Sequence, residues 1–380
     1  MSNNQKSWNA VAAMFALNGA LFGIWASRIP AVVERFELSH SSVGMLLLLM
    51  AGGAIVTFPI AGHFADKVGA FTVTRLVGLF YIVALVLLGL SNSVFFLAIS
   101  LFFFGVTHGA MDVAMNSWAT EVEKANAKPQ MSSFHAMFSV GAGLGAATGF
   151  VAVKAGLSPL THFTIASISI GAVAFVFANI KWASDRHETN GKPPLFALPK
   201  GPLLVVGIVA FCAAIGEGGM ADWSAIFLSS VASASEANAA LGYTVFSAGM
   251  VLVRFLGGQV IARLGNRTSA RLGGAFALVG CSLAVISGSL LAGLMGFAFM
   301  GMGYALIIPI AFSIAAQLSP KSPGVAIAGV STLGYGGLLL GPPIIGFVAA
   351  ATSMRMAFLV IAALALVIVV LSKSLQASTS

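Results

Sequence analysis

Charged residues are scarce in this chain, and their scarcity excludes most classes of soluble protein. Asp, Glu, Lys and Arg make up 8% of the 380 residues, and only 11 residues are acidic. In a soluble domain about a quarter of the residues are charged. Since 58% of the residues here are hydrophobic, the composition indicates an integral membrane protein.

Cysteine is also scarce, and the usual signatures of metal sites and enzymes are missing. The two cysteines, Cys212 and Cys281, both fall within apolar runs, and the 6 histidines show no clustered metal-ligand spacing. No G-x-x-x-x-G-K-S/T phosphate-binding motif occurs, and no nucleophile–base set stands out. We therefore expect no metal, no cofactor, no ATP-driven machinery in the chain and no enzymatic activity.

What the sequence does contain is a series of long apolar runs. Spanning about 30 Å of hydrocarbon takes about 20 helical residues, and on that basis we count twelve runs. An open strand would leave backbone polar groups unsatisfied in lipid, so the runs must be helices. They lie approximately at residues 7–26, 42–62, 71–90, 94–118, 132–153, 160–180, 202–228, 240–261, 270–286, 290–314, 325–350 and 356–371.

The basic residues are distributed unevenly between the loops. With the N-terminus inside, fourteen Lys and Arg residues fall on the cytoplasmic side and four on the outer side, while Arg254 falls within a run. This distribution is the positive-inside asymmetry. We therefore expect both termini in the cytoplasm and the protein in the cytoplasmic (inner) membrane of a bacterium. The net charge of +8 then reflects topology, and we expect no nucleic-acid partner.

Two short polar strings show that the chain is internally repeated. Residues 62–69 read GHFADKVG and residues 258–265 read GQVIARLG, so in both a glycine precedes a cation by five residues and another glycine by seven. The offset is 258 − 62 = 196 residues. Each string ends one apolar run and precedes another, and its turn requires the positive φ that glycine adopts readily.

Two further marks repeat at nearly the same spacing. Gly149 and Gly346 begin the same tetrapeptide, GFVA, at an offset of 197, and Trp25 and Trp223 are 198 residues apart. Three marks at one spacing indicate two related halves. The predicted parts are residues 1–181, a cytoplasmic linker at residues 182–200, and residues 201–380.

The G-x-x-x-D-K-x-G pattern resembles the loop between the second and third helices of the major facilitator superfamily, and this resemblance covers the whole chain. It implies an all-α membrane fold with twelve helices in two pseudo-symmetric halves, a usually monomeric state, and transport of a small-molecule solute by alternating access. The alternative is a short hydrophilic turn without a gating role. The gating candidates in the two strings are Gly62, Asp66, Lys67, Gly69, Arg75, Gly258, Arg263 and Gly265.

The fourth run carries the most informative polar residues. His108, Asp112 and Asn116 are spaced at i, i+4 and i+8, so they share one face of a helix. An Asp near the bilayer centre costs about 2.5 to 3.5 kcal/mol on insertion scales, which demands compensation. The string GAMDVAMN at residues 109–116 resembles the fourth helix of the fucose permeases, where an acid four residues before an asparagine is associated with proton coupling.

Carried over by position, the resemblance makes Asp112 the protonatable acid and Asn116 a polar group of the substrate cavity. The alternative is a structural ion pair of Asp112, for instance with Arg254. The fucose permeases have a second acid in the first helix, where this chain has Ala26. Either Asp112 couples alone, or another acid has taken the role.

Two other residues are candidates for proton coupling. Glu217 lies in the seventh run, the repeat counterpart of the first, and in this family both line the central cavity; the alternative is a structural pair. His135 opens the fifth run, and it could bond the Asp112 carboxylate or accept its proton, since an imidazole titrates near pH 6.5. A plain polar contact between helices is the alternative for His135.

The remaining candidates concern gating and the cavity. Arg28 and Asp222 both lie near the outer end, and a pair between them could close an outer gate. Arg254, inside the eighth run, is expected to face protein because lipid exposure of its charge is expensive. Trp25 also suits an outer-interface position. The cavity candidates, besides His108 and Asn116, are Asn18, Trp25, Trp223, Tyr304 and Tyr335.

We therefore expect a secondary active transporter that moves a small polar, possibly sugar-like solute with protons through membrane lipid. A proton-driven exporter of small amphipathic compounds is the main alternative. Antiporters of the superfamily have a Gly-Pro in the fifth helix, whereas this chain reads Gly145-Ala146 there, which favours the symporter. A channel and a membrane-embedded enzyme are less well supported by the pattern.

Overall fold

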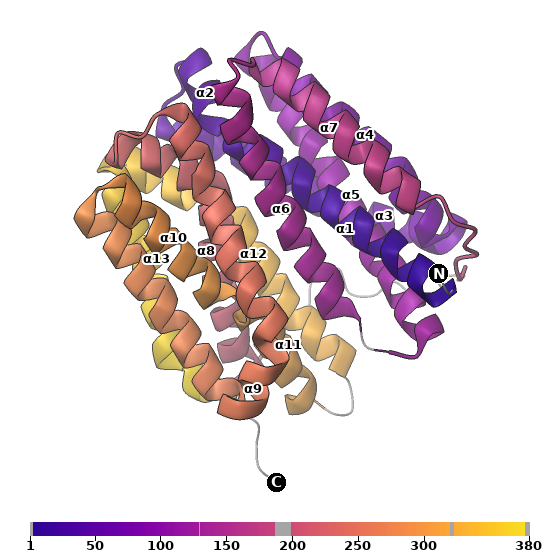
Figure 1. Cartoon of the computed structure of the whole chain (residues 1–380). Helices are drawn as coiled ribbons and strands as arrows, with labels where there is room; N and C mark the ends of the chain where they lie inside the picture. Colours follow the sequence, from indigo (N-terminus) through magenta and orange to yellow (C-terminus); the bar gives the residue numbers. More distant parts are fainter. Residues whose placement is uncertain (1–2, 129, 187–198, 320–322, 377–380) are drawn as a thin grey trace. The chain divides into compact units, whose positions relative to one another are not determined.

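The structure, a computed structural model, describes residues 3–128, 130–186, 199–319 and 323–376, and these residues contain helices and no strand (Figure 1). The helices before residue 187 are α1 (Asn3–Ser27), α2 (Ile29–Arg35), α3 (His40–Val68), α4 (Ala70–Leu90), α5 (Val94–Asn126), α6 (Met131–Lys154) and α7 (Pro159–Phe177). Those after residue 198 are α8 (Pro202–Val231), α9 (Glu236–Ser287), α10 (Leu290–Tyr304), α11 (Ile307–Leu318), α12 (Pro323–Ala351), α13 (Met354–Leu371) and the 3-10 helix η1 (Ser372–Leu375).

Eleven of the described helical segments are long and apolar enough to cross a membrane. The predicted runs at residues 240–261 and 270–286 belong to one of them, α9, whose 52 residues are interrupted at Gly265 by a backbone with φ 74° and ψ 165°. The run at residues 290–314 consists of α10 and α11 together, which form a single candidate span. The all-α membrane fold that the sequence predicted is therefore confirmed.

By its internal contacts the chain forms two compact units. Unit 1 consists of Met1–Glu37 and Leu46–Pro193, and unit 2 consists of Leu38–Met45 and Pro194–Ser380. The first turns of α3 thus belong to unit 2, while the rest of that helix belongs to unit 1.

Six serines cap helix N-termini, and they repeat along the chain. Each accepts, through its Oγ, the amide N–H three residues further on, a contact that contributes about 1 kcal/mol to a helix. The offsets are 235 − 39 = 196, 289 − 93 = 196 and 353 − 158 = 195, so the repeat seen in the sequence recurs in the capping of the helices. The pairs are Ser39 with Ser235, Ser93 with Ser289, and Ser158 with Ser353.

The glycine turns that the two polar strings predicted are present in both units. Gly69, between α3 and α4, has φ 100°, and Gly265, within α9, has φ 74°. These residues are 265 − 69 = 196 positions apart. A side chain at either position would force its Cβ against the backbone, so glycine is required at the same point of each repeat.

The start of the predicted linker belongs to unit 1 and contacts the helices α4 and α5 of that unit. The Trp182 indole N–H donates to Glu121 Oε2 on α5 at 2.7 Å. The Ser184 Oγ accepts the amide N–H of Phe71 at 3.0 Å, which caps the N-terminus of α4 where Gly69 has no side chain to do so. The linker prediction at residues 182–200 otherwise falls mostly on residues 187–198, which lie outside the described residues.

The glycine turns generate a stability prediction. Gly265→Ala should lower the thermal unfolding midpoint, because its φ and ψ of 74° and 165° are nearly restricted to glycine and cost about 1 to 3 kcal/mol for other residues. Gly258→Ala is the matched control, since a Cβ there meets nothing within 4 Å and alanine is the better helix former. The midpoints would be measured in detergent by intrinsic fluorescence, and equal midpoints for the two variants would contradict the prediction.

Candidate functional site

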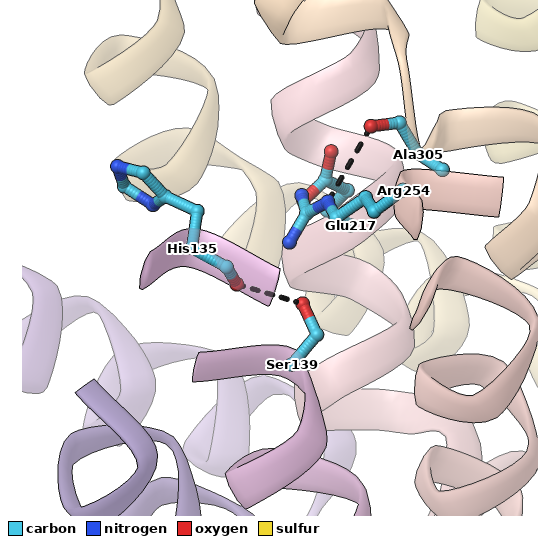
Figure 2. Close-up of polar contacts among 5 residues, drawn as sticks. All are labelled: His135, Ser139, Glu217, Arg254 and Ala305. Atoms are coloured by element: carbon cyan, nitrogen blue, oxygen red, sulfur yellow. Dashed lines mark hydrogen bonds and ion pairs between the residues drawn. The ribbon is translucent and has the colours of Figure 1, made fainter. Parts of the chain in front are cut away.

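Unit 2 contains an ion pair between two membrane-spanning helices. Arg254 on α9 and Glu217 on α8 approach each other with 3.6 Å between the Arg254 Nη2 and the Glu217 Oε2 (Figure 2). The Arg254 side chain is 14% exposed and the Glu217 side chain 23% exposed, so the pair is largely buried within the protein. Each charge alone would be expensive inside a membrane, and each compensates the other here.

Arg254 also contacts the backbone of a third helical segment. Its Nε donates to the carbonyl oxygen of Ala305 at 3.4 Å, at the junction of α10 and α11 (Figure 2). The second carboxylate oxygen of Glu217, Oε1, is buried and has no hydrogen-bond partner within the described part of the chain. One guanidinium therefore links α8, α9 and the α10–α11 junction.

Two buried tyrosines lie on the helices that form or adjoin this pair, Tyr304 on α10 and Tyr243 on α9. Tyr304, the last residue of α10, is fully buried, and its ring fills the space that a side chain at Gly216 would occupy. Tyr243 on α9 is also buried, and its ring stacks on that of Phe246 with 6.0 Å between the centroids. Tyr243 is not among the residues that the sequence predicted for the site, and its one signal there is that Tyr is rare, with 4 in the chain.

Asp222 and Trp223 lie further along α8. Asp222 is 4% exposed, and its Oδ1 has no hydrogen-bond partner among the described residues. Trp223 is fully buried, with its ring centroid 6.3 Å from that of His40, which also belongs to unit 2. Tyr335 on α12 differs from these buried residues, because it is 38% exposed.

In unit 1 the predicted polar stripe lies along α5. The Asn116 amide donates to the Asp112 carbonyl oxygen at 2.8 Å and to its carboxylate Oδ1 at 3.1 Å. One turn earlier, the His108 Nδ1 and the Tyr81 hydroxyl are 2.9 Å apart, which ties α5 to α4. Tyr81 is fully buried and was missed by the sequence analysis, because nothing in the local pattern of α4 shows that it faces a histidine.

Asn18 and Trp25 on α1 are both inside unit 1. Asn18 is fully buried; its amide donates to the Met115 sulfur at 3.5 Å, and its Oδ1 has no partner among the described residues. Trp25 is 2% exposed, with its ring centroid 6.2 Å from that of Phe104. This burial corrects the interface interpretation of Trp25, because an interface tryptophan presents its ring to the headgroup region.

His135 lies near the start of α6 with an exposed side chain. Its ring meets Phe15 edge-on at 5.3 Å, and its carbonyl oxygen accepts the Ser139 hydroxyl at 3.3 Å (Figure 2). The proposed bond from His135 to the Asp112 carboxylate stays a prediction.

The gating candidates differ in their exposure, from the buried Arg28 to the exposed Lys67. Arg28 is 3% exposed and donates twice to the Leu157 carbonyl oxygen, at 3.2 and 3.1 Å. Its predicted pair with Asp222 stays a prediction. At the first polar string, Asp66 is half-buried, Lys67 is exposed, and the Arg75 guanidinium lies 5.3 Å from the centroid of the Phe71 ring.

The described residues contain no group of three or more His, Cys, Asp or Glu side chains that could hold a metal ion. The polar groups that the structure does bring together are an ion pair, hydroxyls, amides and one imidazole–phenol contact. This chemistry suits the binding of a proton or of a small polar molecule.

Comparison with known proteins supports the same family throughout the chain. The family model described as Major Facilitator Superfamily matches residues 10–230 and 206–375. The uncharacterized transporter y4wD of Sinorhizobium fredii is 42% identical over 369 residues, which cover 97% of this chain and 98% of that protein. The membrane protein MosC of Rhizobium meliloti is 32% identical, with 94% of this chain and 88% of that protein covered.

Solved structures agree on the fold at low sequence identity. A bacterial homologue of the human lysosomal transporter Spinster matches with a TM-score of 0.74 at 15% identity, covering 97% of this chain and 95% of that one. The nucleoside transporter NupG matches with a TM-score of 0.72 at 11% identity, covering 99% of each chain. The chain is therefore a multi-pass membrane transporter that belongs to the major facilitator superfamily.

Proposed function

We propose that this chain is a secondary active transporter that moves a small polar, sugar-like solute together with protons and has no enzymatic role. We place it, as a monomer, in the cytoplasmic membrane of a bacterium with both termini inside. The resemblance of residues 109–116 to the fourth helix of the fucose permeases supports the choice of solute. The observation on which the proposal chiefly rests is the Glu217–Arg254 ion pair between α8 and α9.

An ion pair inside membrane helices gives proton coupling a physical basis. Ionised Glu217 attracts the Arg254 guanidinium, whereas a protonated carboxyl carries no charge and releases it. The two protonation states therefore favour different arrangements of α8 and α9. A proton gradient can then shift the population between access states, which is the requirement for driven transport by alternating access.

Asp112 is the second acid in the proposal. Its carboxylate already accepts a hydrogen bond from Asn116, so a proton taken up at Asp112 would compete with that bond within α5. We propose His135 as a proton acceptor for this acid. A purely structural role for Asp112 is the alternative, and the second experiment below separates the two.

A polyhydroxyl solute needs donors and acceptors that are not already paired. The Tyr304 hydroxyl and the Asn18 Oδ1 are buried without partners among the described residues, and each could bond a solute hydroxyl after a side-chain movement. We propose that such groups, considered within each unit by itself, contact the solute. The other proposed contacts are His108, Asn116, Trp25, Trp223 and Tyr335.

The first prediction concerns Glu217. In proteoliposomes supplied with a panel of monosaccharides and nucleosides, an imposed pH gradient should drive accumulation of at least one solute. Glu217→Gln should abolish that accumulation, because glutamine cannot bind or release a proton, while exchange of labelled for unlabelled solute continues. Glu236→Gln, at the start of α9, is the control and should behave like the unmutated protein. Undiminished accumulation by Glu217→Gln would contradict the assignment.

The second prediction fixes the direction of coupling. When solute flows inward down its own gradient, with no imposed pH gradient, a symporter carries protons with it and acidifies the lumen, which a trapped pH-sensitive dye reports. An exchanger of solute for protons would make the lumen more alkaline, and that result would favour the exporter alternative. Asp112→Asn should reduce the protons moved per solute if this acid takes part in coupling, and should leave the ratio unchanged if it is structural.

A further inference from the structure

A membrane-spanning segment of unit 2 is interrupted. α10 ends at Tyr304 and α11 begins at Ile307, although both belong to one candidate span, Leu290–Leu318. Lipid offers no donors to a backbone carbonyl, so an interruption inside a membrane needs a partner from the protein for each carbonyl that it exposes. A carbonyl that loses its helical donor at this interruption must therefore accept a hydrogen bond from another part of the protein.

The sequence identifies that carbonyl. In a continuous helix the amide N–H of residue 309 would donate to the carbonyl oxygen of residue 305, but residue 309 is proline and has no N–H. The next bond of the ladder is intact, since the Ile310 N–H donates to the Leu306 carbonyl oxygen at 3.0 Å. Pro309 thus leaves the Ala305 carbonyl without its helical donor, and the Arg254 Nε donates to it at 3.4 Å (Figure 2).

The same guanidinium reaches Glu217 with its Nη2, at 3.6 Å from Oε2. A guanidinium is planar and rigid, so fixing the direction of its Nε–H also fixes where its terminal nitrogens point. A lysine has a single flexible ammonium group and could not make the two contacts in this fixed relation. The Ala305 carbonyl therefore determines how Arg254 is presented to Glu217.

Two glycines allow the interruption to approach both charged helices. Gly257 lies three residues after Arg254 on α9, and a Cβ there would be 2.7 Å from the Leu306 Cδ2. Gly216 precedes Glu217 on α8, and the Tyr304 ring occupies the place of its missing side chain. The residues on both sides of Ala305 are thus held against the helices that supply Arg254 and Glu217.

We propose that Pro309 and the Ala305 carbonyl form a positioning site for Arg254. The carbonyl holds the guanidinium in place to pair with Glu217, and it remains the partner of Arg254 when Glu217 takes up a proton. The α10–α11 interruption is then linked to the protonation of Glu217. The role of the proton rests on the proposed function above, whereas the positioning itself does not.

The test uses dicyclohexylcarbodiimide, which modifies protonated carboxyl groups in apolar surroundings and reacts poorly with an ion-paired carboxylate. Labelling of Glu217 in the purified full-length protein would be followed by mass spectrometry, without solute or pH gradient. Pro309→Ala restores an N–H that competes with Arg254 for the Ala305 carbonyl, so labelling should become at least about tenfold faster, as expected for losing a hydrogen bond to a charged group. Arg254→Lys should have a similar effect.

Two further variants make the result specific. Pro309→Gly restores the same N–H, while glycine favours the helix less than alanine does. Its labelling rate should rise as for Pro309→Ala, and it serves as the test if the alanine variant folds poorly. Pro59→Ala changes a proline inside another membrane helix, α3, and should label at the unmutated rate. If Arg254→Lys labels faster while both Pro309 variants retain the unmutated rate, the positioning site is wrong. Loss of coupled transport with the expected labelling pattern would overturn the proposed function alone.

Discussion

An arginine inside a membrane-spanning helix must be surrounded by acceptors, and the interior of unit 2 is arranged around this requirement. Arg254 has a carboxylate from α8 at 3.6 Å and a backbone carbonyl from the α10–α11 junction at 3.4 Å. Removing one partner from a buried ion pair typically costs about 3 to 5 kcal/mol. Close packing at Gly216 and Gly257 accompanies the approach of both acceptors to one guanidinium.

The two repeats share their turns and caps but differ in their polar residues. Gly69 and Gly265 have positive φ at an offset of 196, and His108 and Tyr304 stand at the same offset on α5 and α10. The ion pair has no such counterpart, since 254 − 196 = 58 is a phenylalanine and 217 − 196 = 21 is a leucine. The repeat thus supplies a common scaffold, while the charged pair belongs to the second unit alone.

Much of the fold could be predicted from the sequence because its determinants are local. Apolar runs must be helical in lipid, and the glycine of each polar string needs a positive φ. The site depends on contacts between distant segments, which a single sequence does not show. Within unit 2, Arg254 contacts Glu217 and a backbone oxygen, and its alternative pair with Asp112 stays a prediction. A backbone carbonyl that acts as a ligand is not visible in the residue types of a sequence. Here the one indication is Pro309, which lacks the N–H that would donate to the Ala305 carbonyl.

The most direct test of this account is a double-mutant cycle on thermal stability with Glu217→Gln, Arg254→Gln and the double variant. If the two charges compensate each other inside the membrane, each single variant leaves a charge without its partner and lowers the unfolding midpoint, while the double variant recovers most of the loss. If the effects of the two single variants simply add in the double variant, the pair is not what unit 2 is arranged around, and the account is contradicted.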